Sequence, residues 1–335
     1  TDSYGIAWYG IAWYASHCML WDPRDLILYS CVGTVQQHIR SIRSYLTTQQ
    51  HMTSTTTTTT TSSSSSSSSV PGIRIVCISD THGAHGGMSP LPSGDVLIHG
   101  GDFSRTGVLH GVQSFLSWLD SQPHAHKVFI AGNHDTSLHR EYYKATGAQR
   151  FHRISDDKKA DEVCDQCREM VDTAASTYLE DSGVTLTFST SMGADGGPTH
   201  LSDPSHTINI YGSPWQPSFC NWAFNLERGD PLRAVWSAIP QDCDVLVTHS
   251  PPHGLGDRNS EGMNCGCEDL LYEVTSRESP PRLHIFGHIH DDYGWWSNGK
   301  TLFVNASTFD SSGDPSNAAV VVFLPFDKNL PASVV

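Results

Sequence analysis

Five short polar clusters between residues 80 and 290 carry the residue types in this sequence that can do chemistry. Histidine, aspartate and one asparagine side chains make up a mixed nitrogen and oxygen donor set, without a thiolate, that suits divalent Mn, Fe, Zn or Ni ions. The sequence therefore predicts a metal site built from several separate segments. The clusters are Asp80-Thr81-His82, Gly101-Asp102-Phe103, Gly132-Asn133-His134-Asp135, Thr248-His249 and Gly287-His288-Ile289-His290.

The spacing within the clusters indicates how these side chains could share ions. Residues two apart in an extended segment point the same way, so Asp80 and His82 can bind one ion together. The same spacing directs His288 and His290 toward one side, where two neighbouring ions could take one each. Asp102, on a strand of its own, is suited to bridge the two ions. The glycines before several of these residues allow a sharp turn and a close approach of the backbone to a phosphate.

Each cluster follows a short apolar run that predicts a buried strand. These runs are Ile73–Ser79, Asp95–His99, Lys127–Ala131, Asp244–Thr248 and Leu283–Phe286, and two later strands, Leu302–Asn305 and Ala319–Leu324, are expected to complete a second sheet. Helices are predicted over Val108–Ser121, Thr136–Ala145, Asp161–Tyr178, Pro231–Ile239 and Cys267–Thr275, and an exposed loop over Met192–Ser205. The alternation predicts stacked α/β layers, which bind ligands at the carboxyl ends of their strands.

A single one of these clusters is more often a turn than a ligand group. Five clusters in this order, each closing a predicted strand, are not explained by turn chemistry, and we interpret them as one metal site.

The amino-acid composition indicates which classes of partner and which cellular compartment to expect. The 335 residues hold 20 Lys and Arg against 35 Asp and Glu, a net charge of −15, so we expect no nucleic-acid partner. An acidic protein that binds an anionic substrate needs local positive charge, which metal ions can supply. No run of eighteen apolar residues occurs, and we expect no membrane span. Nine Cys without framework spacing are typical of a reducing compartment, so a cytoplasmic protein is expected.

Three regions are predicted along the chain. Residues 1–52 contain the repeated pentapeptide GIAWY and no evident chemistry, and residues 53–69 consist only of Thr and Ser. Such a tract cannot bury enough apolar surface to offset its ordering entropy, and we expect a disordered linker. Residues 70–335 then form the catalytic domain.

The motifs DxH, GD, GNHD, TH and GHIH, in this order, resemble those of the calcineurin-like metallophosphoesterase superfamily. The longer strings GDFSRTG, KVFIAGNHD, INIYGSPWQPSF, DVLVTHSPPHG and LHIFGHIH are similar to the branch of metallophosphoesterase-domain-containing proteins, for members of which metal-dependent cyclic-nucleotide phosphodiesterase activity is reported. The resemblance covers residues 72 to 325, with divergent or inserted segments at Phe151–Ala175 and Met192–Ser205.

The resemblance implies a four-layer α/β/β/α sandwich with two metal ions. It implies that His134 faces the leaving group while Asp135 orients its imidazole. One ion would be held by Asp80, His82, Asp102 and His290, and the second by Asp102, Asn133, His249 and His288.

The expected activity is metal-dependent hydrolysis of small phosphodiesters, with cyclic nucleotides as the leading substrates. Two divalent transition-metal ions, Mn first and Fe, Zn or Ni as alternatives, would clamp a phosphoryl group and acidify a water that attacks phosphorus in line. His134 would protonate the departing alkoxide. A phosphomonoesterase or protein phosphatase uses the same motifs, and a nucleotide-binding regulator with negligible turnover is a further alternative.

Weaker candidates lie near the motifs. His85, His99 and His253 are interpreted as structural or as partners of ligands. Trp215 and Phe219 either stack on a nucleotide base or belong to the core. Cys164 and Cys167 are interpreted as two unrelated thiols on a polar helix.

Overall fold

The computed structural model describes residues 70–189 and 205–335. These residues belong to the second of two compact units, Ser69–Val335. The predicted N-terminal region 1–52, the predicted linker 53–69 and most of the predicted loop Met192–Ser205 lie outside the described residues. Within the described ranges, no helix combines the length and the apolar character needed to cross a membrane.

Short strands form a first six-stranded sheet around β1. Strands β1 to β4 run parallel, β13 pairs antiparallel with β1, and β14 pairs antiparallel with β13. In spatial order the strands are β14 (Ser333–Val334), β13 (Val320–Pro325), β1 (Gly72–Ile78), β2 (Val96–His99), β3 (His126–Ile130) and β4 (Thr177–Leu179).

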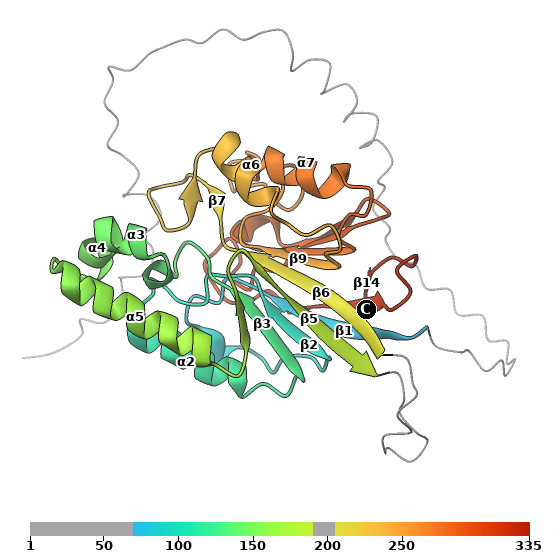
Figure 1. Ribbon diagram of the computed structural model, residues 1–335, viewed down its shortest axis with the longest axis horizontal. Helices are drawn as coiled ribbons and strands as arrows, with labels where there is room; N and C mark the ends of the chain where they lie inside the picture. Colours follow the sequence, from blue (N-terminus) through green and yellow to red (C-terminus); the bar gives the residue numbers. More distant parts are fainter. Residues whose placement is uncertain (1–69, 190–204) are drawn as a thin grey trace, which may run out of the picture. The chain divides into compact units, whose positions relative to one another are not determined.

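A second six-stranded sheet faces the first (Figure 1). Its four inner strands are parallel, and its two edge strands, β11 and β5, pair antiparallel with their neighbours. The order is β11 (Gly294–Ser297), β12 (Leu302–Asn305), β10 (Leu283–Phe286), β9 (Val245–Thr248), β6 (Ser205–Ser213) and β5 (Ser182–Ser189). Two short strands, β7 (Gln216–Pro217) and β8 (Asn225–Leu226), pair separately.

Hydrophobic side chains fill three interfaces and define four layers. The first core lies between the sheets, where Ile98 of β2 belongs to one cluster with Ile285 of β10. The second core joins the first sheet to α2 (Leu109–Asp120) and α5 (Asp157–Thr173). The third joins the second sheet to α6 (Asp230–Trp236) and α7 (Glu268–Ser276). The predicted α/β/β/α sandwich is confirmed (Figure 1).

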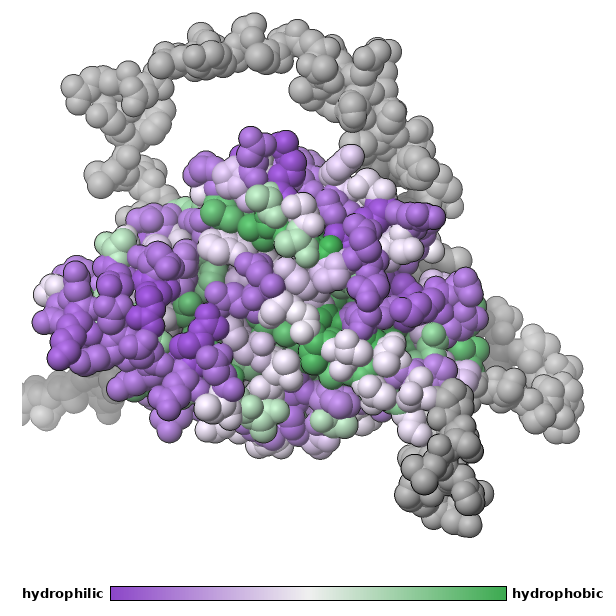
Figure 2. Space-filling model, in the orientation of Figure 1, coloured by the Kyte–Doolittle hydropathy of each residue, from purple (hydrophilic) through white to green (hydrophobic). Residues whose placement is uncertain are grey.

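The layers explain why the central strands are continuous apolar runs. Strands β2, β9, β10 and β12 are buried at every position, because a helix layer covers one face and the other sheet covers the opposite face. The outer helices need only one apolar side. The surface over α5 is hydrophilic (Figure 2), while Cys164 and Cys167 face inward as separate buried thiols.

Several sequence-based boundaries were wrong. The strand predicted at Ala319–Leu324 exists as β13, but it joins the first sheet rather than completing the second. The helix predicted at Asp161–Tyr178 begins at Asp157, where Asp156 caps it by accepting a hydrogen bond from the Lys159 amide, and it ends at Thr173. Its predicted last turn is instead strand β4, because Thr177–Leu179 pairs with β3.

The helix predicted at Thr136–Ala145 is broken into short turns. A 3-10 turn (Thr136–Leu138) is followed by α3 (Arg140–Tyr142), a π turn (Tyr143–Gly147) and α4 (Ala148–His152). Strands β5, β6 and β11 were not predicted, and Ser205, assigned to a loop, begins β6.

The second core generates a stability prediction. The rings of Phe103 and Phe115, the latter on the buried side of α2, stack 4.2 Å apart at 11°, and both side chains are fully buried. Phe115→Ala should lower the free energy of unfolding by about 3–5 kcal/mol, measured by urea denaturation, because it leaves a cavity that the core cannot refill. Tyr272→Ala on the exposed side of α7 is the control and should change it by less than about 0.5 kcal/mol. Equal effects of the two changes would contradict this packing.

Candidate metal centre

The predicted ligands leave the carboxyl ends of five parallel strands drawn from both sheets. The segment after β1 is tied to the segment after β2, because the Asp80 amide donates to the Gly101 carbonyl and the His82 amide donates to the Asp102 carbonyl, both at 2.9 Å. In the second sheet, the Gly287 amide donates to the His249 carbonyl at 3.0 Å. The backbone itself thus brings the separate motifs together.

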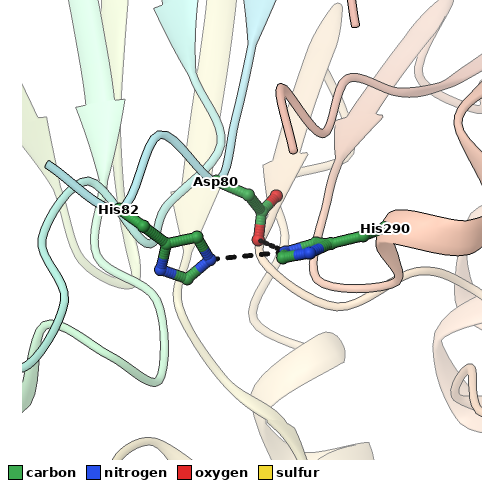
Figure 3. Close-up of side chains that lie close together, drawn as sticks. All are labelled: Asp80, His82 and His290. Carbon is green, nitrogen blue, oxygen red and sulfur yellow. Dashed lines mark hydrogen bonds and ion pairs between the residues drawn. The ribbon is translucent and has the colours of Figure 1, made fainter. Parts of the chain in front are cut away.

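One cluster consists of Asp80, His82 and His290, whose ligand atoms all lie within 4.8 Å of one another (Figure 3). The Nε2 atoms of His82 and His290 are 3.3 Å apart, and Nε2 of His290 is 3.4 Å from Oδ1 of Asp80. Two imidazoles and a carboxylate from segments about 200 residues apart in sequence therefore converge on one point. These are three of the four residues predicted for the first ion.

A second cluster consists of Asp102, His249 and His288, again with all ligand atoms within 4.8 Å. Nε2 of His249 lies 3.4 Å from Oδ2 of Asp102 and 3.0 Å from Oδ1 of Asn133. The three members of this cluster, together with the adjacent Asn133, are the four residues predicted for the second ion.

Asp102 links the first cluster to the second, and with His82 and His134 it forms a third group of possible ligands. Its Oδ2 atom is 3.9 Å from Nε2 of His82 on one side and 3.4 Å from Nε2 of His249 on the other. Its Oδ1 atom accepts a hydrogen bond of 2.7 Å from the His134 amide, which fixes the carboxylate plane. One oxygen of a single buried carboxylate faces both groups, which is the placement that a bridging ligand requires.

The donor chemistry at His249 fits a bound cation. Nδ1 of this ring lies 3.0 Å from the Gly100 carbonyl, and it must carry a proton to donate to that oxygen. In the neutral imidazole, Nε2 is then a bare lone pair that faces the oxygens of Asn133 and Asp102. Three acceptors that face one another need a proton or a metal ion between them, and a ligating His held by a backbone carbonyl is a common arrangement at metal sites.

The electrostatic environment shifts the pKa values of four predicted ligands toward the protonation states that metal binding requires. Burial alone would raise the pKa values of Asp80 and Asp102, but His290 beside the first and His249 beside the second outweigh it and hold both pKa values below their usual range. Burial, followed by the charge of His134, lowers the pKa of His82 to about 3. Burial, followed by His249, lowers the pKa of His288 to about 3. These two imidazoles are therefore neutral, as metal binding requires.

The ligand segments adopt backbone conformations that side chains rarely take. Four predicted ligands have positive φ angles, in the left-handed region that non-glycine residues seldom adopt. They are Asp80 at 52°, His82 at 43°, Asp102 at 54° and His288 at 69°. Such strain is retained where the surrounding structure enforces it, most often at functional sites.

Two glycines stand against carboxylates. A Cβ at Gly287 would overlap an oxygen of Asp80, and a Cβ at Gly132 would overlap an oxygen of Asp102. The sequence-based reason for these glycines was close approach to a phosphate. In the structure the absence of a side chain at these two positions leaves the space that the two buried carboxylates occupy.

His134 and Asp135 are placed differently from the expectation. Asp135 accepts hydrogen bonds from the amides of Gly132 and Ser104 and from the Ser104 hydroxyl, and it does not orient the His134 ring. The Arg105 carbonyl holds that ring instead, 2.7 Å from Nδ1. Nε2 of His134 points to the centre, 4.0 Å from Oδ2 of Asp102, and the side chain is 28% exposed. Asp135 is thus a brace between the β2 and β3 segments.

Sequence reasoning missed two neighbours of the site. The ring of Trp222 stacks on His134 with centroids 4.1 Å apart at 25°, and the ring of Phe151 stacks on Trp222 with centroids 4.7 Å apart at 21°. Ser307 donates a hydrogen bond of 3.0 Å to Oδ2 of Asp80. Trp222 and Ser307 do not stand at a spacing that relates them to a ligand motif, and only the tertiary fold brings them to the site.

Among the weaker histidines, His99 supports the centre. Its Nε2 atom lies 3.0 Å from the Thr81 hydroxyl, and its Nδ1 atom accepts from the Gly101 amide at 3.2 Å, which ties two ligand segments to β2. His85 instead contacts Ser114. His253 lies beside Asp257 and Glu268, and neither it nor His85 belongs to the clusters of the described residues.

The chain is similar to several known proteins. Residues 73–292 match the family described as Calcineurin-like phosphoesterase. Metallophosphoesterase domain-containing protein 1 of Homo sapiens is 38% identical over 258 residues, which are 76% of this chain and 72% of that protein. A UPF0046 protein of Caenorhabditis elegans is 35% identical over 263 residues, 76% of this chain and 60% of that protein. The solved structure of a Haemophilus influenzae NAD nucleotidase aligns with a TM-score of 0.42 at 12% identity, over 79% of this chain and 49% of the other.

The glycine next to His288 gives a direct test of the packing around Asp80. Gly287→Ala should displace the Asp80 carboxylate and cost about 1–3 kcal/mol of stability, with a loss of bound metal measured by mass spectrometry after dialysis. Gly86→Ala is the matched control, because nothing lies within 4 Å of its added Cβ. Parental metal content and stability in the Gly287 variant would show that Asp80 is not packed against this glycine.

Metal binding should also depend on pH through His249. Burial opposes charge on this ring, but the Asp102 carboxylate outweighs it and raises the pKa of His249 to about 9 in the metal-free protein. Below that pH an ion must displace a proton, so the apparent affinity for Mn²⁺ should rise from pH 6 to about pH 9. Calorimetry in buffers of different ionisation enthalpy should detect proton release at pH 7. Binding without proton release would contradict the assigned charge state.

Proposed function

The chain belongs to the calcineurin-like phosphoesterase family, and on that premise we propose that it hydrolyses small phosphodiesters, with cyclic nucleotides as the leading substrates. The family implies a dinuclear centre of divalent metal ions. We propose Mn²⁺ as the ion, because the donor set mixes imidazole nitrogens with carboxylate and amide oxygens.

The observation that carries this proposal is the position of Asp102 between two ligand clusters. On one side Asp80, His82 and His290 would hold the first ion, and on the other Asn133, His249 and His288 would hold the second. When bound, such a pair of ions supplies Lewis acidity to a phosphoryl oxygen and lowers the pKa of a coordinated water. The same ions supply the positive charge that an acidic protein needs in order to bind a phosphate ester.

His134 is suited to protonate the leaving group. In its protonated form the Nδ1–H stays on the Arg105 carbonyl, so the Nε2–H is the proton that faces the centre. Stacking on Trp222 keeps the ring plane fixed while the proton moves. The ring is partly exposed, so a leaving oxygen can reach it, and no covalent intermediate with the protein is needed.

The substrate class is tested by a panel of phosphate esters with Mn²⁺ present. Bis-p-nitrophenyl phosphate and cyclic AMP should be hydrolysed, and p-nitrophenyl phosphate should be a poorer substrate. Asp102→Asn is the control for contaminating activity, because it removes the bridging charge at nearly constant size and should abolish turnover of all three. Turnover of the monoester alone would replace this proposal with a phosphomonoesterase. Rates equal to the metal-free background would favour a nucleotide-binding regulator.

The proton-donor assignment makes a separate prediction. His134→Ala should lower the rate on cyclic AMP by about 10²–10⁴-fold, as loss of a general acid typically does. The deficit should be much smaller for bis-p-nitrophenyl phosphate, because p-nitrophenolate leaves without protonation. Kinetics on the two esters measure this difference, and metal content should stay at the parental value. An equal deficit on both would exclude the acid role.

A further inference from the structure

Three aromatic side chains are exposed in the part of the chain that the structure describes: Phe219 at 58%, Tyr272 at 70% and Trp295 at 50%. Of these rings, only that of Phe219 lies against a predicted ligand. Its centroid is 6.4 Å from that of His288, and the two rings meet edge to face at 82°. A large apolar surface is therefore left in water at the edge of the candidate metal centre.

The loop that carries Phe219 is held in place by the rest of the fold. It connects β7 to β8, and a second aromatic residue of the loop, Trp222, stacks on His134. The hydroxyl of Tyr142 donates to the Asn221 carbonyl at 2.8 Å. The side-chain amide of Asn225 donates to the carbonyl of Phe219 itself at 2.9 Å. The exposed ring thus projects from a braced loop.

The backbone of this loop is strained as well as braced. Cys220, Asn221 and Phe224 have φ angles of 47°, 49° and 55°, in the left-handed region. The Phe224 amide donates to Nδ1 of His139 at 2.8 Å, which supports the last of them. Strain of this kind persists where the surrounding structure enforces it, and here it occurs in the loop whose Phe219 ring contacts His288 and whose Trp222 ring stacks on His134.

The structure gives different roles to Trp215 and Phe219, for each of which the sequence allowed either base stacking or a place in the core. Trp215 donates its Nε1–H to Asp181 at 2.7 Å and packs against Phe224 and His139, so it is part of the scaffold. Phe219 has an exposed apolar surface beside His288, at the edge of the candidate metal centre. A planar ring is the chemistry that matches an exposed phenyl group.

We propose that Phe219 determines specificity by stacking on the nucleobase of the substrate, so that nucleoside phosphate esters are preferred over esters without a base. This inference rests on the proposed function, because it assumes that the phosphoryl group lies on the metal centre. Base–aromatic stacking tolerates any base, so the site would select for the presence of a base rather than for its identity.

The test compares cyclic AMP with the base-free ribose 3′,5′-cyclic phosphate. For Phe219→Ala, the ratio of kcat/KM between the two esters should fall about tenfold, the size of one base–aromatic stack. Phe219→Trp should restore the ratio, because the larger ring also stacks. Tyr272→Ala, which removes a still more exposed aromatic side chain on α7, is the matched control and should leave the ratio unchanged. An unchanged ratio in Phe219→Ala would overturn the inference while leaving the phosphodiesterase proposal standing.

Equilibrium binding of 5′-AMP separates the two proposals if turnover is absent. Phe219→Ala should weaken AMP binding about tenfold by calorimetry in the presence of Mn²⁺, and ribose 5-phosphate binding should change much less. That result with no hydrolysis of cyclic AMP would reject the proposed function and retain the stacking site. Equal loss for AMP and ribose 5-phosphate, or no AMP binding by the parent protein, would reject the stacking site.

Discussion

Two buried carboxylates impose the constraint on which the rest of this structure depends. Asp80 is fully buried and Asp102 is 2% exposed, and both lie at strand ends inside the sandwich. Taking an ionised carboxylate out of water costs several kcal/mol unless positive charge and hydrogen-bond donors surround it. The protein meets that cost with the amide of His288 and the hydroxyl of Ser307 around Asp80, and with the amide of His134 and the ring of His249 around Asp102.

The same constraint explains the local geometry. Four predicted ligands adopt left-handed backbone where the chain leaves the ends of its strands. Glycine at 287 and 132 leaves room for the carboxylates that arrive from the neighbouring segments. Protons on the ligand imidazoles supply compensating charge in the metal-free protein: against the effect of burial, Asp102 raises the pKa of His249 to about 9, and Asp80 shifts the pKa of His290 in the same direction. Two divalent cations would replace those protons with stronger compensation, so the features that stabilise the apo site also make it a metal site.

Much of this organisation could be predicted from the sequence, because it depends on short segments whose residue types reflect their own burial. Runs such as Leu283–Phe286 and Leu302–Asn305 are strands at the expected residues, since full burial on both faces demands continuous apolar sequence. The polar clusters follow their strands directly. Strand β5 was not recognised because its side chains are mostly exposed or half-buried, which removes the apolar signal. Strand β13 belongs to the first sheet because it pairs with β1, and the hydrophobic pattern of the sequence does not indicate which strand β13 pairs with.

Contacts between distant segments were the other part that could not be predicted. Asp135 follows His134 in the chain, and that adjacency suggested that it orients the ring. In the fold its carboxylate points back to the β2 segment, and the carbonyl of Arg105 takes its place. Trp222 reaches His134 only because the β7–β8 loop packs against that side of the site. The ligand types are thus readable from the sequence, whereas the side chains that orient them follow from the tertiary packing.

The most direct test of this account is anomalous diffraction from crystals of the protein grown with Mn²⁺, recorded on both sides of the manganese absorption edge. The account predicts two anomalous peaks that share Asp102, one contacted by Asp80, His82 and His290 and the other by Asn133, His249 and His288. A single peak, or two peaks that do not share the Asp102 carboxylate, would contradict the claim that this buried carboxylate bridges a dinuclear centre.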